Sequence, residues 1–307
     1  MIVTVTMNPA IDKTIEIDEM ICGGLNRIKA FESDAAGKGI NVSKTIKALG
    51  GKSIAIGFIG GDAGNTIKNA LDAEGIENDF VYVDGITRTN TKVFENSGRV
   101  TELNEPGPNI KDEDIEKLFE IIEKYASKDT LFILAGSVPA GVEKTIYRDI
   151  TEKVHSLGAK VFVDADGEIF VRALEAKPDY IKPNDVELAQ YCNISGDITE
   201  DQIIEMAEKL VSEGIGHVAV SMGKEGAIFV SEDEKFMCKG LKVEAHSTVG
   251  AGDAMVAAIS YGVSEKISFR DCARLGIATS AGAVMTKGTK PPTKETVNSL
   301  IGKVEFK

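Results

Sequence analysis

The sequence is poor in the residues that build metal sites and disulfide frameworks. It contains no tryptophan, three histidines and four cysteines among 307 residues. No two cysteines form a CxxC pair, and His155, His217 and His246 lack the spacing of a zinc motif. These absences argue against a zinc-binding or disulfide-stabilised protein and favour the reducing environment of the cytoplasm.

Long apolar runs are absent too. The amino terminus has neither a basic start nor a long apolar stretch, so we expect no signal peptide. No apolar run approaches the roughly 20 residues that cross a membrane. The formal net charge of -13 disfavours nucleic acid, whose phosphates attract clustered Lys and Arg. We therefore expect neither a membrane nor a nucleic-acid partner, although a few local cations can still bind an anionic small molecule.

Three familiar nucleotide-binding signatures are missing. The P-loop pattern GxxxxGK[ST] does not occur, and neither do the HRD and DFG motifs of protein kinases. Two partial matches to the dinucleotide pattern GxGxxG begin at Gly37 and Gly250, but Val42 and Met255 occupy the place of the third glycine. P-loop NTPases, protein kinases and dinucleotide-binding dehydrogenases are therefore poorly supported.

What the chain does contain is an alternation of apolar, strand-length segments with amphipathic, helix-length segments. This alternation predicts an α/β fold with a mainly parallel sheet covered by helices on both faces. No Pro- or Ser-rich linker interrupts it, so we expect a single domain over residues 1–307. The expected strands are 2–6, 53–59, 130–135, 160–164, 180–182, 217–221 and 227–231, and the expected helices are 39–49, 62–74, 142–156 and 199–213, with 252–263 and 269–285 closing the chain.

Two stretches depart from this rhythm. Thr14–Ser33 and about Thr89–Leu103 contain short polar–apolar alternations, such as Arg27–Ala30. A period of two predicts half-exposed antiparallel strands, which would form a small sheet projecting from the main domain. Surface hairpins without a role are the alternative.

The glycine-rich segment Ser247–Met255 carries the strongest chemical signal. Gly250 and Gly252 flank Ala251 at the start of an apolar helix, where free amides and the helix dipole favour a phosphate. Asp253 follows in the first helical turn, where a carboxylate can accept a proton from an attacking hydroxyl. Read alone, this motif favours Asp253 as a simple helix cap, and the neighbouring motifs change that balance.

Two further turns contain ligand-type side chains. Gly37-Lys38-Gly39 enters a helix that contains Asn41, which suits a phosphate and sugar hydroxyls, although a simple helix entry explains it as well. Asn184 and Glu187 follow a short strand and share a helix face. Their oxygens suit Mg²⁺, and the same spacing is that of a capping box.

The remaining candidates are weaker. Ser221–Gly226 closes one strand and enters another, so it can line a nucleotide or form an ordinary hairpin. Asp12 follows the first strand, Arg88 starts an alternating stretch, and Ser137 follows a buried strand. Ligands of α/β sheets bind at such strand ends.

Taken together, these segments resemble the phosphofructokinase B family of ribokinase-like sugar kinases. The resemblance rests on Thr6–Asp12, Ala36–Val42, Gly136–Pro139, Lys182–Glu187 and Gly250–Asp253, and it extends over almost the whole chain. It implies a three-layer α/β domain with a small β-sheet lid, here about residues 12–35 and 88–105. In relatives this lid closes over the sugar and often forms the contact of a homodimer.

The resemblance also implies a role for each matching residue. Asp253 would be the general base, and the amides of Gly250, Ala251 and Gly252 an anion hole. ATP would contact Lys182, Asn184, Ser221, Met222, Gly223, Lys224, Glu225, Gly226, Gly252, Ile277 and Ala281. The sugar would contact Asp12, Arg27, Gly37, Lys38, Asn41, Arg88 and Ser137, while Asn184 and Glu187 would hold Mg²⁺.

The expected reaction is ATP-dependent phosphorylation of a ketohexose phosphate, in the first place D-fructose 1-phosphate to fructose 1,6-bisphosphate. Some relatives carry a Lys two residues before Arg27, where this chain has Leu25, so the existing phosphate is expected on Lys38, Arg88 and Arg27. Three alternatives stay open: phosphorylation of tagatose 6-phosphate, phosphorylation of an uncharged sugar or nucleoside, and a non-catalytic nucleotide- or sugar-binding regulator. The intact Asp253 argues against the last.

Overall fold

The computed structural model describes residues 1–194, 196 and 198–307. Its main body is a nine-stranded sheet in the order β13-β12-β11-β10-β9-β8-β1-β4-β5. The strands are β1 Ile2–Thr6, β4 Ile54–Ile59, β5 Glu77–Tyr82, β8 Leu131–Ala135, β9 Lys160–Asp164, β10 Tyr180–Ile181, β11 His217–Ser221, β12 Gly226–Ser231 and β13 Lys235–Lys239. All neighbours are parallel except those of β12, which pairs antiparallel with β11 and β13.

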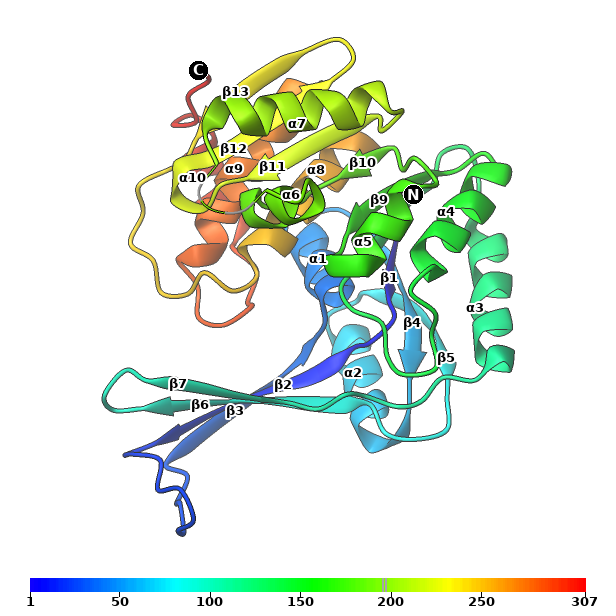
Figure 1. Cartoon of the computed structure of the whole chain (residues 1–307). Helices are drawn as coiled ribbons and strands as arrows, with labels where there is room; N and C mark the ends of the chain where they lie inside the picture. The colour runs from blue at the N-terminus through cyan, green and yellow to red at the C-terminus, as the bar shows by residue number, and fades with distance from the viewer. Residues whose placement is uncertain (195, 197) are drawn as a thin grey trace.

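Helices cover both faces of this sheet and make three layers (Figure 1). One face packs against α3 Asp112–Tyr125, α4 Ile146–Ser156, α5 Gly167–Leu174, α6 Asp185–Tyr191 and α7 Glu200–Ser212. The other packs against α1 Lys38–Ala48, α2 Gly61–Ala73, α8 Ala251–Ser264, α9 Phe269–Val284 and α10 Lys294–Ile301. Strand β1 is buried along its whole length, as expected for a central strand of a parallel sheet that is covered on both faces. The predicted α/β class and mainly parallel sheet are confirmed.

A second sheet of four strands, here called the small sheet, projects from the body (Figure 1). Its order is β3-β2-β6-β7, with β2 Ala10–Ile17, β3 Ala30–Ala36, β6 Arg88–Glu95 and β7 Val100–Asn104. The β2–β3 and β6–β7 pairs are antiparallel, as expected, but β2 and β6 run parallel. They are parallel because each leaves the same edge of the body and extends in the same direction.

Several sequence-based boundaries were wrong. The polar–apolar alternation of Arg27–Ala30 predicted a strand there, but β3 begins only at Ala30, and residues 27–29 lie outside the strands. The helix expected from 142 begins at Ile146. Three helices close the chain instead of two, because α10 follows α9. Within the described part of the chain, no helix is both long and apolar enough to cross a membrane.

Candidate active site

Most candidate residues meet at the carboxyl-terminal edge of the parallel strands. Strands β1, β8, β9, β10 and β11 all end at this edge, and the residues that follow them turn out of the sheet. Thus Asn8 follows β1, Ser137 follows β8, Asp164 ends β9 and Lys182 follows β10. Segments far apart in the sequence are thereby brought together at the usual ligand-binding edge of an open α/β sheet.

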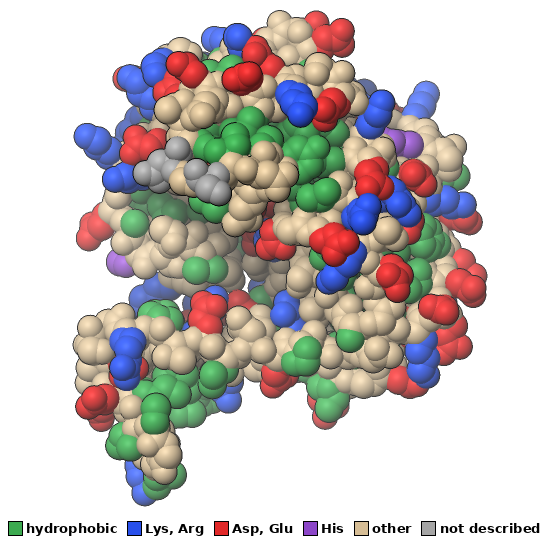
Figure 2. Space-filling view, in the orientation of Figure 1, with side chains coloured by type: hydrophobic (Ala, Val, Ile, Leu, Met, Phe, Trp, Pro, Cys, Tyr) green, Lys and Arg blue, Asp and Glu red, His purple; other side chains and the backbone are tan. Residues whose placement is uncertain are grey.

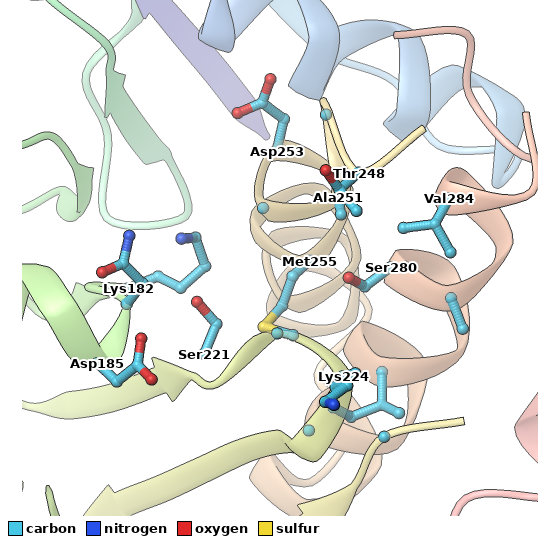
Figure 3. A pocket seen from close by; sticks show the side chains of 18 of the residues that line it. Lys182, Asp185, Ser221, Lys224, Thr248, Ala251, Asp253, Met255, Ser280 and Val284 are labelled. Atoms are coloured by element: carbon cyan, nitrogen blue, oxygen red, sulfur yellow. The ribbon is translucent and has the colours of Figure 1, made fainter. Parts of the chain in front are cut away.

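A cavity of about 630 Å³ lies between this edge and the helices α8 and α9. Figure 3 shows Lys182 and Ser221 on one side of it, Ser280 and Val284 on the other, and Asp253 and Lys224 toward opposite ends. The predicted ATP residues that line it are Lys182, Asn184, Ser221, Gly223, Lys224, Gly226, Gly252, Ile277 and Ala281.

The predicted hairpin at residues 221–226 is present, with a short 3₁₀ turn at Gly223–Glu225 between β11 and β12. Two of its members do not line the cavity. Met222 packs against the core under α3–α7, and Glu225 is exposed. The hairpin therefore combines structural and cavity-facing residues.

A smaller cavity of about 190 Å³ lies on the other side of Lys38. Its lining includes Gly37, Lys38, Arg88 and Ser137 from the predicted sugar site, together with Thr6, Asn8, Ala135, Gly136 and Asp166. Gly37 has φ +123°, and a Cβ there would stand 2.7 Å from the Thr6 side chain, so glycine is required at this turn. Lys38 lines both cavities and thus marks their junction.

Two ammonium groups at this junction share one buried carboxylate. Asp164 is 2% exposed, and its Oδ1 lies 3.6 Å from Lys38 Nζ and 3.4 Å from Lys182 Nζ. Burial opposes ionisation of Asp164, but the two cations outweigh it and hold its pKa below the ordinary value. The same attraction to Asp164 outweighs the cost of burial at Lys38 and raises the pKa of its ammonium. Asp164 and Lys38 are therefore both charged at neutral pH.

Asp253 stands at the third position of α8, facing the same junction. The helix begins after Gly250, whose φ of +83° is in the left-handed region that favours glycine. The Asp253 carboxylate is 8% exposed and accepts a hydrogen bond of 2.8 Å from Asn41 Nδ2. Burial and then the nearby Asp164 raise its pKa to about 6, while Asn41, Lys38 and Lys182 oppose the rise. Near neutral pH, this carboxylate can therefore take up and release a proton.

Asn184 and Glu187 form the capping box that their spacing predicted. Asn184 Oδ1 accepts from the Glu187 amide at 2.7 Å, and Glu187 Oε2 accepts from the Asn184 amide at 2.8 Å. Both side chains also line the larger cavity. The cap holds the two oxygen-bearing groups in a fixed relation at the cavity wall.

Other predicted sugar residues lie apart from the small cavity. Asp12, on β2, accepts from Asn90 Nδ2 at 3.1 Å and lies 3.6 Å from Lys92 Nζ. Asn41 is directed to Asp253, as described above. Arg27 is exposed in the loop between β2 and β3, at the outer end of the small sheet.

Sequence reasoning missed several cavity residues. Asp164 carried no motif, although its place at the end of an expected strand was a usable signal. The apolar walls contributed by Leu241, Val243 and Val284 come from a loop and a helix end without distinctive spacing. Asp166 follows Asp164 by two residues and lines the smaller cavity.

Comparisons with known proteins agree with this geometry. The model of the pfkB family carbohydrate kinases matches residues 5–296. The 1-phosphofructokinase of Haloferax volcanii is 37% identical over 298 residues, covering 97% of this chain and 95% of the relative. That of Bacillus subtilis is 34% identical over 306 residues, covering 99% of both.

Among solved structures, phosphofructokinase-2 from Escherichia coli in complex with substrates and products has a TM-score of 0.92 at 28% identity, covering 98% of both chains. Arabidopsis thaliana ribokinase complexed with ribose and ATP has a TM-score of 0.80 at 22% identity and covers 98% of both chains, which supports the fold alone. On the family match and the full-length relatives, the chain belongs to the pfkB family of carbohydrate kinases, enzymes that transfer a phosphoryl group to an alcohol.

Proposed function

We propose that the protein transfers the γ-phosphoryl group of ATP to the 6-hydroxyl of D-fructose 1-phosphate and yields fructose 1,6-bisphosphate. The observation that carries this proposal is the position of Asp253, a buried carboxylate with a pKa of about 6 at the amino end of α8. It faces the junction of a large cavity and a small one. A base between a nucleotide and an acceptor is what phosphoryl transfer to a hydroxyl needs.

The larger cavity suits the nucleotide. Its volume of about 630 Å³ is in the range of small-molecule sites. Leu241, Val243 and Ile277 offer apolar surface for a base, whereas Lys182 and the Gly250–Gly252 amides lie toward Asp253. ATP would thus lie with its phosphates toward the start of α8, where the helix dipole and free amides favour negative charge.

The residues then divide the chemical step between them. Asp253 accepts the proton of the 6-hydroxyl while the 6-oxygen forms a bond to the γ-phosphorus. The bond from that phosphorus to the β–γ bridging oxygen breaks, and ADP leaves with the electron pair. The amides of Gly250, Ala251 and Gly252 stabilise the charge on the transferring group. Lys38 and Lys182, both held by Asp164, add positive charge at the same point.

Asn184 and Glu187 fit a Mg²⁺ site that acts through water. Their capping box engages Glu187 Oε2, and the carboxylate has a second oxygen at the cavity wall. Mg²⁺ in such sites keeps several waters and uses few protein groups. When bound with ATP, the ion neutralises phosphate charge.

The choice of acceptor rests on the relatives. The full-length relatives reported above are named 1-phosphofructokinases, and this supports fructose 1-phosphate over tagatose 6-phosphate. For Asp12, Arg88 and Ser137 we propose contacts to the sugar, with Arg88 fixed by donating to the Asn8 carbonyl at 3.0 Å. We also propose that the protein acts in the cytoplasm and as a homodimer joined through the small sheet, which serves as a lid over the sugar.

The test is an ADP-release assay with Mg-ATP that compares fructose 1-phosphate, fructose 6-phosphate, tagatose 6-phosphate and ribose. We expect kcat/KM to be highest for fructose 1-phosphate, and the product should be fructose 1,6-bisphosphate. Preference for another acceptor would replace the substrate assignment. ATP binding without ADP release from any acceptor would instead indicate a regulator.

A further inference from the structure

A substrate that already carries a phosphate needs a cation at the end remote from the reacting hydroxyl. In fructose 1-phosphate the phosphate and the 6-hydroxyl lie at opposite ends of the molecule. Lys38 is beside Asp253 and Asp164, at the reacting end, so it cannot also hold the remote phosphate. Arg27 is exposed at the outer end of the small sheet. Arg88 already donates to the carbonyls of Asn8 and Glu105, at 3.0 and 3.5 Å.

Lys92 is a second cation on the strand of Arg88. Its side chain is only 16% exposed, which is unusual for a lysine. Its Nζ lies 3.6 Å from Asp12 Oδ2, and among the described residues it makes no hydrogen bond. A lysine ammonium has three donors. Here, the ammonium of a largely buried lysine keeps donors that no described hydrogen-bond acceptor uses.

The direction of the Lys92 side chain also points to the site. The strand register sets Lys92 opposite Glu102 of β7 and Thr14 of β2, so these three side chains share one face of the small sheet. The Lys92 ammonium lies beside Asp12 of β2, whose register partner on β6 is Asn90. The ammonium is therefore displaced along β6 from Lys92 toward Arg88.

The face that carries Lys92 is the one turned toward the body. Arg88, Asn90 and Lys92 alternate along β6 and so share a face. Arg88 lines the small cavity, and Glu32 on the same face lies 3.4 Å from Lys290, in the segment between α9 and α10. Figure 2 shows the hollow between the small sheet and the body, with charged side chains along it. On this face of the four strands, Arg88 and Lys92 are the only cationic residues.

We propose that Lys92 binds the phosphate that the sugar already carries and so determines the preference for a phosphorylated acceptor. This inference rests on the proposed function. On binding, the phosphate would displace no hydrogen bond of Lys92. The Lys92 ammonium would then interact with both the phosphate and Asp12. Arg88 would support the sugar nearer to the reacting end.

The experiment compares Lys92→Met with the wild-type protein. Methionine keeps the length of the side chain and removes its charge. Because the group lies far from the reacting atoms, KM for fructose 1-phosphate should rise about 10- to 100-fold, the range expected for a lost charge-assisted hydrogen bond. The value of kcat and the KM for ATP should stay within about threefold. Calorimetry with fructose 1-phosphate alone should show the same loss of affinity, and Lys92→Arg should restore most of it.

Lys117→Met is the matched control, because Lys117 also pairs with a buried aspartate, Asp114, but on α3 of the body, where it lines neither cavity. It should leave both KM values unchanged. A structural role for Lys92, neutralising Asp12, would make Lys92→Met silent in an Asp12→Asn background. Our proposal requires the same loss of fructose 1-phosphate affinity there. Unchanged affinity in Lys92→Met overturns the inference alone, whereas an inactive wild-type protein overturns the proposed function.

Discussion

At the scale of single residues, the site is a balance of two carboxylates and two ammonium groups. Asp164 attracts Lys38 and Lys182 most directly, because its Oδ1 lies within 3.6 Å of both ammonium nitrogens. Asp253 is then left with burial, a like-charged neighbour and one amide donor, Asn41. The result is a carboxylate whose pKa is about 6, high enough to make it a useful base and low enough to keep it ionised at pH 7.5.

Asp253→Asn tests the role of this carboxylate as a base. The amide keeps the shape and can still accept from Asn41, but it cannot take a proton. We expect kcat to fall by about 10²- to 10⁴-fold, the usual contribution of a general base, with little change in the KM for ATP. Steady-state kinetics at saturating fructose 1-phosphate measure this. Turnover within tenfold of wild type would contradict the assignment.

The same variant should change stability in a pH-dependent way. The folded protein binds the Asp253 proton more tightly than the unfolded chain, since the pKa rises from 3.8 to about 6 on folding. Stability is therefore lost as pH rises between these values, by up to roughly 3 kcal/mol above pH 6. Asp253→Asn removes this cost. Its free energy of unfolding should exceed that of wild type at pH 7.5 and approach it near pH 4, as urea titrations at both pH values would show. An equal difference at both pH values would exclude the titration as its cause.

Residues in a recognisable local motif were predicted, and residues defined by distant partners were not. Asp253, Lys38 and Asn184 each follow or precede a glycine, proline or asparagine signal within a few positions. Asp164 belongs to no such motif, and its importance comes from Lys38 and Lys182, which only the sheet brings to it. Lys92 was hidden for the same reason, because its partner Asp12 is on another strand.

At the scale of elements, the start of α6 combines two possible tasks that one substitution can separate. Glu187→Gln keeps an oxygen to accept from the Asn184 amide, so the capping box survives. It also removes the negative charge proposed to attract Mg²⁺. We expect the melting temperature to change by less than about 2 °C, because a retained cap costs little. The Mg²⁺ concentration for half-maximal activity should rise several-fold.

Glu187→Ala is the companion variant, since it removes the charge together with the bond that the Glu187 side chain accepts from the Asn184 amide, while Asn184 still caps the helix. It should lose about 0.5–1.5 kcal/mol of stability, the net contribution of one hydrogen bond, as well as the Mg²⁺ response. An unchanged Mg²⁺ requirement in Glu187→Gln would exclude a role of Glu187 in metal binding and leave only its role in the capping box.

The elements themselves were predictable where the apolar period was strong. Strand β1 and helix α8 lie within a residue or two of their expected bounds. The small sheet was foreseen from its alternation, but the parallel pairing of β2 with β6 was not, because pairing between segments more than seventy residues apart leaves no local trace. Residues 27–29 show the limit of the pattern, since Lys29 bonds to Glu16 through its amide and yet no strand forms there.

At the scale of the whole molecule, the small sheet has two unlike faces. The polar face carries Asp12, Arg88 and Lys92 toward the body. The opposite face carries Ile15, Phe31 and Leu103, of which Phe31 is 66% and Leu103 53% exposed. Apolar side chains gather on the projecting sheet in Figure 2. A protein with a net charge of -13 has few reasons to expose such residues together unless they meet a partner.

We therefore predict that the wild-type protein is a homodimer joined through this apolar face. Sedimentation equilibrium at micromolar concentration should give twice the mass of one chain. The double variant Phe31→Ser, Leu103→Ser should shift the equilibrium toward monomer, because each change removes an apolar side chain from the contact. Because Phe31 and Leu103 are exposed in the single chain, both substitutions should cost the folded monomer itself little stability.

The dimer should also matter for catalysis, since the same sheet carries Asp12, Arg88 and Lys92 on its other face. Losing the contact would let the projecting strands move, and KM for fructose 1-phosphate should rise before kcat falls. Lys117→Ser provides the control, because it replaces a polar residue on α3 of the body, away from the small sheet. A wild-type protein that sediments as a monomer at every concentration would refute the predicted contact. If the double variant remained a dimer, the dimer contact would have to lie on another surface of the protein.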